Sequence, residues 1–393
     1  MFSTTDTIVA VATPRGRGAI GMVRLSGEAS TAVLARLTGR TRPFTPRVAT
    51  LCRIDGLDEV VVTFFEGPAS FTGEDVVEVS AHGSPVILDA LVAAAIEHGA
   101  RHAQPGEFTL RAVLNGRMDL VQAEAVADLI QSGTRLQAGT AFDQLDGTLT
   151  ARIRAIEQRL FELQALLEAS LDFPDEGYRF IETAAVSERI EILRADVDRL
   201  LGDGRAGRVI REGARVVLAG SRNAGKSTLF NRLVGFNRAI VSDIAGTTRD
   251  MVTEEVDLDG LLIRLVDTAG LGAPADAVEA EGMARARGAS EAADLTVVVR
   301  DGTRALTEDE RRLVASLDPS HVVVAVNKID LVAPGETVRD AGGLARLETV
   351  SISARDGAGL AALQAAMLGK LRGGETSRER PAVSNARHIA LLA

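Results

Sequence analysis

The stretch Gly220-Ser-Arg-Asn-Ala-Gly-Lys-Ser227 decides the fold of the C-terminal half of this 393-residue chain. The apolar run Val216–Ala219 precedes it, and Thr228-Leu229-Phe230 follows it as the start of a helix. A strand, a glycine-rich loop and a helix in this order bind phosphate, because backbone N–H groups and the helix N-terminus then face one anion. In such a loop Lys226 reaches the β- and γ-phosphates of a nucleotide, and the Ser227 hydroxyl is a ligand for Mg²⁺.

A second motif indicates which base is bound. Asn327-Lys-Ile-Asp330 follows the apolar run Val322–Val326, at the sheet edge where α/β folds place their ligands. The Asp330 carboxylate can accept hydrogen bonds from N1–H and the 2-amino group of guanine, whereas adenine presents an acceptor there. Such a site can discriminate by roughly 10⁴-fold. We expect Asn327 to tie the base loop to the phosphate loop, and Lys328 to cover the purine face.

Two segments after later strands extend this site. Ser353-Ala354-Arg355 follows the apolar run Thr349–Ile352 and is expected to supply backbone N–H groups to the guanine carbonyl. Asp267-Thr268-Ala269-Gly270 closes a predicted hairpin over Val252–Val266, with a turn at Asp259-Gly260. Its aspartate is expected to hold Mg²⁺ through a water molecule, and the N–H of its glycine to sense the γ-phosphate.

The remaining switch segment lies between these motifs. Gly246-Thr-Thr-Arg-Asp250 offers the Thr248 hydroxyl as a second ligand for Mg²⁺. Leu271 stands where Ras-like switches carry the glutamine that orients the attacking water. Because leucine cannot orient water, help must come from another side chain in 271–285 or from a cation. The order and spacing of the motifs predict a mostly parallel, Ras-like α/β GTPase domain over 213–372.

Composition excludes several classes of protein. The formal net charge of −10 argues against a broad basic face for nucleic acid, and leaves only local arginine patches. The candidate patches are Arg15 with Arg17, and Arg205, Arg208, Arg211 and Arg215. The single cysteine, Cys52, excludes an internal disulfide framework and a multi-cysteine metal site. No apolar run approaches the ~18 residues of a membrane span, and no signal sequence is visible, so we expect no membrane association and a cytoplasmic location.

Two other patterns flank the GTPase motifs. Residues 1–118 predict an α+β domain, with strands at 8–12, 19–25, 60–65 and 76–79 and helices near 29–37 and 85–98. Residues 119–212 have helical periodicity, with one apolar stripe from Ile153 to Leu167 and another from Val186 to Leu201. The second helix is expected to end at Gly202-Asp203-Gly204. Residues 373–393 are expected to return to the helical domain, with Ser384 or Asn385 as the N-cap of a further helix.

With these segments in place, the chain resembles the MnmE (TrmE) family of tRNA-modifying GTPases from about Asp6 to its last residue. Stretches outside the general GTPase motifs carry the resemblance: Asp6-Thr-Ile-Val-Ala, Thr13-Pro-Arg-Gly-Arg-Gly-Ala-Ile-Gly, Phe71-Thr-Gly-Glu-Asp, His82-Gly, Pro105-Gly-Glu-Phe, Leu171-Asp-Phe-Pro-Asp-Glu and Ile244-Ala-Gly-Thr-Thr-Arg-Asp. The family has roughly sixty further residues that end in a Cys-x-Gly-Lys tail, which this sequence lacks. We therefore expect GTP binding and hydrolysis, and doubt complete tRNA modification by this chain alone.

The resemblance implies a folate-binding N-terminal domain that forms a homodimer, a helical domain and an inserted GTPase domain. It also implies a partner, the flavin- and NADH-using protein MnmG. Together the two would modify C5 of the wobble uridine, U34, in certain tRNAs. The added group is aminomethyl or carboxymethylaminomethyl, and its one-carbon unit comes from a tetrahydrofolate derivative.

The resemblance also assigns site residues. It places K⁺ at Asn223, Ser242, Ile244 and Thr247, gives Glu279 a catalytic role beside Lys226, and places 5-formyltetrahydrofolate at Arg24, Glu78 and Arg117. The residues expected to contact GTP are Asn223, Ala224, Gly225, Lys226, Ser227, Thr228, Ser242, Asp243, Ile244, Ala245, Gly246, Thr247, Thr248, Asp267, Thr268, Ala269, Gly270, Asn327, Lys328, Asp330, Ser353, Ala354 and Arg355.

Two other functions remain open from the sequence. One is a GTPase switch in ribosome assembly, similar in its GTPase domain to Era or Der. The other is a folate-dependent one-carbon transferase with a regulatory GTPase domain. Dependence on tRNA and on a flavoprotein partner would separate both from the tRNA-modifying function.

Overall fold

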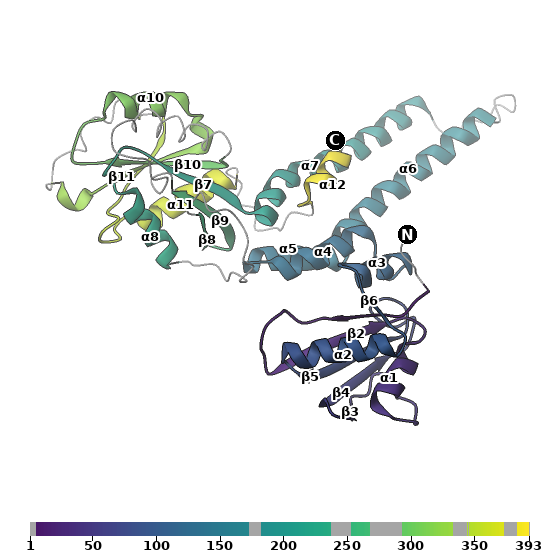
Figure 1. Cartoon of the computed structure of the whole chain (residues 1–393). Coiled ribbons are helices and arrows are strands. Elements are labelled where there is room, and N and C mark those ends of the chain that lie inside the picture. The colour runs from purple at the N-terminus through teal and green to yellow at the C-terminus, as the bar shows by residue number, and fades with distance from the viewer. Residues whose placement is uncertain are drawn as a thin grey trace. The chain divides into compact units, whose positions relative to one another are not determined.

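The computed structural model describes residues 5–172, 182–236, 253–267, 293–332, 344, 346–372 and 383–392. The chain divides into two compact units, 1–124 and 125–393, and each contains a six-stranded sheet (Figure 1). No described helix is long and apolar enough to cross a membrane.

The N-terminal unit is a mixed sheet with helices packed on it. Its elements are β1 (Ile8–Val11), β2 (Ile20–Ser26), α1 (Ser30–Thr38), β3 (Thr50–Ile54), β4 (Asp58–Phe65), β5 (Val76–His82), α2 (Pro85–Glu97), β6 (Arg101–His102) and α3 (Glu107–Leu114). The strand order is β3-β4-β5-β2-β1-β6, and only the β1–β6 pair is parallel. The predicted α+β class is confirmed, whereas β3, β6 and α3 were not predicted.

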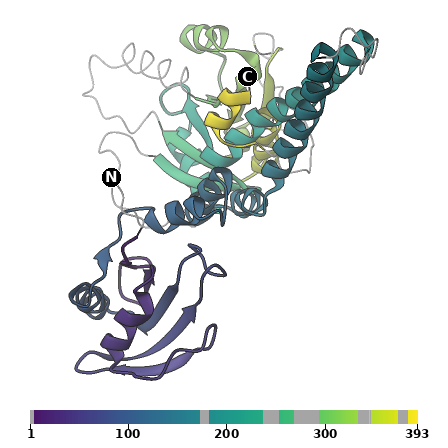
Figure 2. The same ribbon diagram turned by 90° about the vertical axis from the view of Figure 1, so that its right-hand side faces the viewer.

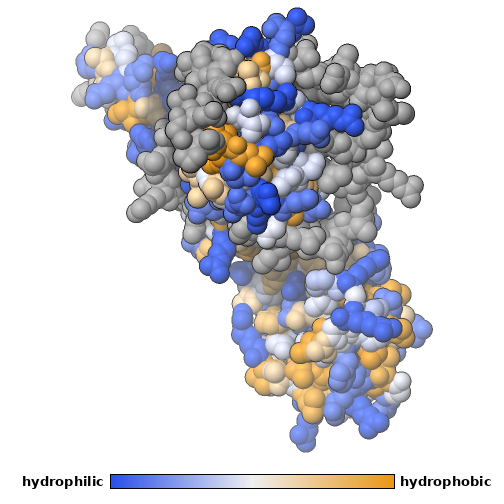
Figure 3. Space-filling view, turned by 90° about the vertical axis from the view of Figure 1, so that its left-hand side faces the viewer, coloured by the Kyte–Doolittle hydropathy of each residue, from blue (hydrophilic) through white to orange (hydrophobic). Residues whose placement is uncertain are grey.

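Alternating burial assigns the two faces of this sheet. Val23, Leu25, Val77 and Val79 are buried in one core with Leu91 of α2, because α1 and α2 pack on that side. Arg24 and Glu78, which alternate with these residues along β2 and β5, are only partly buried. Apolar residues on the visible surface of this unit, at the bottom of Figure 3, lie between polar ones. The period of two thus directs a polar face away from the helices.

The described residues of the helical part form α4 (Leu120–Gln131), α5 (Arg135–Leu145), α6 (Thr148–Asp172), α7 (Thr183–Glu212) and α12 (Ala386–Leu392). Figure 2 shows α6 and α7 running side by side, and the two helices are in contact. Of the apolar stripe from Ile153 to Leu167, only Leu163 is buried. The periodicity therefore predicted the helix correctly, but most of its apolar face is not covered. Asn385 caps α12 as predicted, since its Oδ1 accepts from the Arg387 N–H at 2.9 Å.

The expected helix end at Gly202-Asp203-Gly204 is wrong, because α7 continues to Glu212. The physical reason is packing. A Cβ at Gly204 would lie 2.8 Å from Cγ1 of Ile389, and a Cβ at Gly207 would overlap the carbonyl of Val383. These glycines therefore allow the 383–392 segment to lie close against α7, and they do not stop the helix.

Two of the arginines considered as a basic patch at the end of α7, Arg208 and Arg211, form ion pairs. Arg208 Nη2 lies 3.1 Å from Asp294 Oδ1, and Arg211 Nε lies 2.7 Å from Asp128 Oδ2. Asp294 also accepts from the backbone N–H of Arg215 at 2.9 Å. These contacts favour a structural role for this cluster over a free nucleic-acid surface.

The domain expected to be a GTPase contains a mostly parallel sheet with helices on both faces. Its elements are β7 (Ala214–Ala219), α8 (Lys226–Phe236), β8 (Thr253–Leu258), β9 (Leu261–Asp267), β10 (Leu295–Asp301), α10 (Glu308–Ser316), η3 (Pro319–His321), β11 (Val322–Asn327), η4 (Ile329–Leu331), β12 (Glu348–Ser351) and α11 (Leu360–Leu371). The strand order is β12-β11-β10-β7-β9-β8, with only β8 antiparallel, so the predicted hairpin is confirmed.

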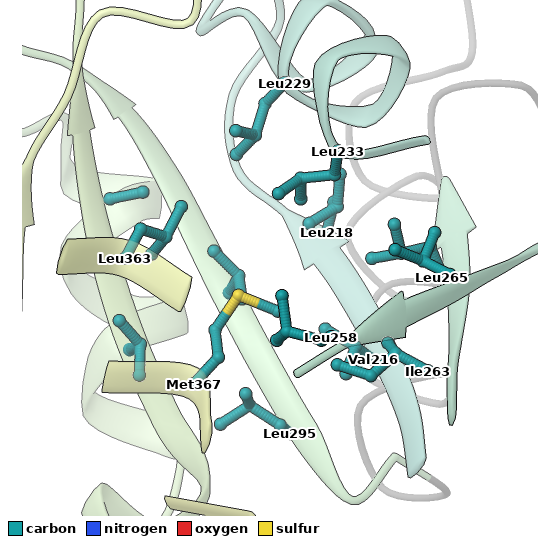
Figure 4. Close-up of a cluster of buried hydrophobic side chains, with 14 of the residues drawn as sticks. Val216, Leu218, Leu229, Leu233, Leu258, Ile263, Leu265, Leu295, Leu363 and Met367 are labelled. Atoms are coloured by element: carbon teal, nitrogen blue, oxygen red, sulfur yellow. The ribbon is translucent and has the colours of Figure 1, made fainter. Parts of the chain in front are cut away.

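Two helices cover one face of this sheet. Leu229 and Leu233 of α8, and Leu363 and Met367 of α11, pack with sheet residues such as Leu218 in one cluster (Figure 4). Another cluster, which includes Leu313 and Val314 of α10, lies against β10 and β11. Since both faces are covered, the loops at the carboxyl ends of the strands are the available place for a ligand.

Candidate functional site

The phosphate loop joins β7 to α8, and backbone conformation sets its shape. Gly220, Asn223 and Gly225 have φ of 137°, 62° and 96°. A Cβ at Gly220 would lie 2.0 Å from the carbonyl oxygen of Val299, so only glycine lets the loop pass β10. Lys226 is buried, and its Nζ donates at 2.9 Å to the carbonyl oxygens of the loop's first two residues. The loop is therefore compact, with its ammonium group held against its own backbone.

Asn327 joins the base side of the site to the phosphate loop. Its Nδ2 donates to the Ala224 carbonyl at 2.8 Å, and its Oδ1 accepts from the Ala354 N–H at 2.9 Å. The tie predicted from the sequence is present, and it brings together the loops that follow β7, β11 and β12. Asp330 is exposed in η4 directly after β11, while Ser353 is buried.

Asp301 is a residue of this site that sequence reasoning missed. Lys328 has a φ of 67°, and its Nζ donates to Asp301 Oδ2 at 2.7 Å. Burial raises the pKa of Asp301, but hydrogen bonds from Lys328 and Thr303 outweigh it and lower the pKa to about 2. The carboxylate is therefore ionised and fixes the lysine. Its position, paired in register with Asn327 at the end of β10, was the available signal.

Two arginines support these loops and carry no motif signal. Arg232 of α8 donates from Nε to the Ala354 carbonyl at 3.2 Å, and from Nη2 to the Arg355 carbonyl. Arg304 Nη2 donates to the Ser221 hydroxyl and, at 3.1 Å, to Glu310 Oε1. Each arginine thus connects one site loop to a helix.

The residues beside the phosphate loop include types that bind a magnesium ion. Ser227 is exposed in the first turn of α8, and Thr228 follows it. Asp267 ends β9 and is paired in register with Leu218, directly before the loop. Hydroxyl and carboxylate oxygens are the donors that Mg²⁺ prefers, and a bound ion would neutralise charge on the β- and γ-phosphates.

Several expected site residues lie outside the described ranges. They are Ser242, Asp243, Ile244, Ala245, Gly246, Thr247, Thr248, Thr268, Ala269, Gly270, Leu271 and Glu279. The described residues therefore cover the phosphate loop, the guanine motifs and the end of β9.

A second group of expected residues lies on the polar face of the N-terminal sheet. Arg24 and Glu78 are cross-strand partners on β2 and β5, and Nη2 and Nε of the arginine lie 2.6 and 3.0 Å from Oε1 of the glutamate. The Arg24 guanidinium lies 5.1 Å from the ring centre of Phe71 and 5.9 Å from that of Phe108. Arg117 Nε donates at 3.0 Å to the carbonyl of the residue before Phe71. One loop thus connects all three expected residues.

A buried charge network stands behind this loop. Arg111 is 2% exposed and contacts Asp6, Glu74 and Glu107, while Arg101 contacts Asp6 and Glu107. Hydrogen bonds, first from Arg101 and then from Arg111, outweigh burial and lower the pKa of Asp6 to about 2. Three of the stretches that distinguish this sequence from general GTPases each contain one of the network's carboxylates.

Comparisons with known proteins cover the whole described chain. Residues 7–117 match the model for the GTP-binding protein TrmE N-terminus, and residues 120–393 match the model for the MnmE helical domain. The tRNA modification GTPase MnmE of Nitrosococcus oceani is 43% identical over 363 residues, which is 91% of this chain and 78% of that protein. The protein of the same description from Neisseria meningitidis serogroup B is 42% identical over 398 residues, which is 100% of this chain and 88% of that protein.

Solved structures add less than these sequence relatives. A structure of Era from Aquifex aeolicus is 29% identical and covers 44% of this chain and 61% of its own, with a TM-score of 0.33. A score this low carries no weight for the assignment. The identities and coverage of the sequence relatives show that the chain belongs to the MnmE family of tRNA modification GTPases, which makes it a GTP hydrolase that acts in tRNA modification.

Proposed function

We propose that this chain hydrolyses GTP in a K⁺-dependent reaction that supports modification of tRNA at C5 of U34. The observation that carries the proposal is Asn223. It lies inside the phosphate loop with a φ of 62° and an exposed side chain. Left-handed backbone is uncommon for residues other than glycine, and asparagine is among those that tolerate it. Because the side chain is exposed, its amide oxygen is available to a cation that lies against the phosphates.

The cation would replace the missing water-orienting glutamine in part. K⁺ beside the phosphates offsets negative charge that develops in the transition state, as an arginine finger does. Ser242, Ile244 and Thr247 would complete its shell, with a backbone carbonyl as the only possible ligand at the isoleucine. Glu279 would orient the attacking water.

Lys226 has the second proposed role in hydrolysis. Its ammonium bonds to two carbonyl groups of the loop, so the loop itself restrains its position. At the β- and γ-phosphates it would add a fixed positive charge. Asp330 would select guanine, and Ser227, Thr248 and Asp267 would hold Mg²⁺.

The N-terminal unit would hold the one-carbon donor. The Glu78 carboxylate can accept hydrogen bonds from pterin N–H groups, and Arg24 and Arg117 can pair with carbonyl or anionic groups of 5-formyltetrahydrofolate. We further propose a homodimer and a complex with the flavoprotein MnmG, in which this unit supplies the carbon unit for U34.

The test is GTP turnover in K⁺ against Na⁺ at equal ionic strength. We expect hydrolysis roughly 10²-fold faster in K⁺, with the difference abolished in Asn223→Ala. Asn231→Ala is the matched control, since Asn231 is also exposed but lies on α8 beyond the loop. Equal rates of the unaltered protein in both salts would contradict the K⁺ assignment. A K⁺ effect that survives Asn223→Ala would place the cation elsewhere.

A further inference from the structure

We propose that Arg111 is a positioning residue for the folate site, where it sets the spacing of the two aromatic rings that hold Arg24. The inference rests on the proposed folate function of Arg24 and Glu78. Arg111 itself is 2% exposed, lies on α3 and acts through the residues it joins.

The two rings come from different segments of the chain. Phe71 lies in the 66–75 connection between β4 and β5, whereas Phe108 lies on α3. Their ring centres are 5.1 and 5.9 Å from the Arg24 guanidinium carbon. A guanidinium in contact with two aromatic rings has fewer rotamers open to it, so it is oriented before a ligand binds. The separation of the two segments therefore determines how firmly Arg24 is held.

Arg111 connects these two segments directly. Its Nη1 lies 3.2 and 3.1 Å from the two carboxylate oxygens of Glu74, which is three residues after Phe71. Its Nη2 lies 3.2 Å from Oε1 of Glu107, the residue immediately before Phe108. One buried guanidinium thus links the residue before Phe108 to a residue three positions after Phe71.

The loop that carries Phe71 is fixed to the same framework. Ser26, two residues after Arg24 on β2, donates from its hydroxyl to Glu74 Oε2 at 2.6 Å. Asn115, just beyond α3, donates from Nδ2 to the Thr72 carbonyl at 2.7 Å. A shift of Glu74 away from Arg111 would therefore move the loop relative to the strand that bears Arg24.

The chemistry requires arginine at this position. A planar guanidinium presents a fork of donors and can hold two carboxylates at once, whereas lysine presents a single charged point. A buried ion pair contributes little net stability but can fix one arrangement among several. Arg101 provides the contrast, because the carboxylates it contacts in the described part of the chain are Asp6 and Glu107, and not Glu74. It belongs to the same network without spanning the two ring-bearing segments.

The experiment compares Arg111→Lys with Arg101→Lys in the full chain. Calorimetric titration with 5-formyltetrahydrofolate gives the affinity, thermal unfolding gives stability, and GTP turnover reports on the other domain. We expect Arg111→Lys to weaken folate binding at least tenfold and Arg101→Lys less than twofold, with unchanged GTP turnover in both variants. Glu74→Gln, which keeps the size of the side chain and removes its charge, should weaken folate binding in the same direction.

Each outcome decides one part of the inference. Equal losses of affinity in Arg111→Lys and Arg101→Lys would show a general effect of network stability and overturn the positioning role. So would wild-type affinity in both Arg111→Lys and Glu74→Gln. If Arg111→Lys does not fold, Glu74→Gln against Arg101→Lys makes the same comparison. Failure of the unaltered protein to bind 5-formyltetrahydrofolate would instead overturn the folate function, and the inference with it.

Discussion

The GTPase domain and the N-terminal unit form their candidate sites in different ways. In the GTPase domain the backbone sets the phosphate loop, through Gly220, Asn223 and Gly225 with positive φ. In the N-terminal unit side chains set the polar face, through the pair of Arg24 and Glu78 and the network around Arg111. The first site depends on residues without a bulky side chain, which let the backbone turn tightly. The second depends on charged side chains that contact one another.

This difference explains what each site shows in the sequence. A loop built from backbone conformation needs glycine or asparagine at fixed spacing, so it leaves a short motif. A network of side chains draws on distant positions, here from Asp6 to Arg111, and has no fixed spacing. The two sites should also fail differently. Adding a methyl group should disable the first, whereas altering a charge should disable the second.

The largest predicted effect is a loss of GTP affinity that leaves folate affinity unchanged. Asp330→Asn should weaken GTP binding by roughly 10⁴-fold, because the carboxylate no longer accepts from both guanine donors. The same variant should gain affinity for xanthosine triphosphate, whose 2-oxo group accepts a hydrogen bond from the new amide. Competition binding with the two nucleotides measures the exchange.

Folate binding is the internal control for this variant. Asp330 belongs to the unit that begins at residue 125, so 5-formyltetrahydrofolate should bind with unchanged affinity. Loss of both nucleotides together would indicate local unfolding around η4, and would contradict the assigned role of the carboxylate.

A methyl group added to the phosphate loop should have the next largest effect. Gly220→Ala places a Cβ 2.0 Å from the Val299 carbonyl at a φ of 137°, so β10 or the loop must move. We expect a loss of about 3 kcal/mol in the free energy of unfolding, together with loss of GTP binding. Denaturant unfolding followed by a GTPase-domain probe measures the change.

Gly235→Ala is the matched comparison for this loss. Gly235 lies in α8, is exposed, and a Cβ there would meet nothing within 4 Å. Alanine should therefore stabilise the helix by up to about 1 kcal/mol. We expect the free energy of unfolding to fall in Gly220→Ala and to rise in Gly235→Ala. A fall in both variants would mean that the loop conformation at Gly220 is not the cause of the destabilisation.

Much of the GTPase domain was predictable from the sequence, because its motifs and strands lie next to each other in the chain. The hairpin, the strand before each motif and the tie of Asn327 to the phosphate loop were all predicted. The ion pair of Lys328 with Asp301 was not, since these residues are neighbours only through the pairing of β10 with β11. Pairing of parallel strands is a property of the sheet and not of either segment.

Elsewhere, tertiary packing overrode local signals. The glycines in α7 resemble a helix end in sequence, yet Gly204 and Gly207 serve close packing against the 383–392 segment. In the N-terminal unit, Arg24 and Glu78 were placed by family resemblance alone. Nothing in their spacing indicated that β2 and β5 would set them side by side. The buried partners of Arg111 were equally invisible.

The smallest predicted effect tests the charge network by pH. The pKa of Asp6 is lowered from 3.8 to about 2 in the folded chain, so its carboxylate stabilises the fold above about pH 4. This contribution is lost as the pH falls from about 4 through 2. Asp6→Asn should therefore lower the stability of the N-terminal unit by roughly 1–2 kcal/mol at pH 7 and by much less at pH 2. Thermal unfolding of both proteins across this range measures it.

The corresponding change in the GTPase domain sharpens this comparison. The pKa of Asp301 is also lowered to about 2, but its ion-pair partner is Lys328, which lies in the loop proposed to bind the guanine base. The difference in stability between Asp301→Asn and the unaltered protein should also shrink at low pH. In addition, Asp301→Asn should bind GTP more weakly at pH 7, because Lys328 loses the carboxylate that holds it. Asp6→Asn should leave GTP binding unchanged. A stability difference for Asp6→Asn that stays constant from pH 7 to 2 would mean that the carboxylate acts by shape and not by charge.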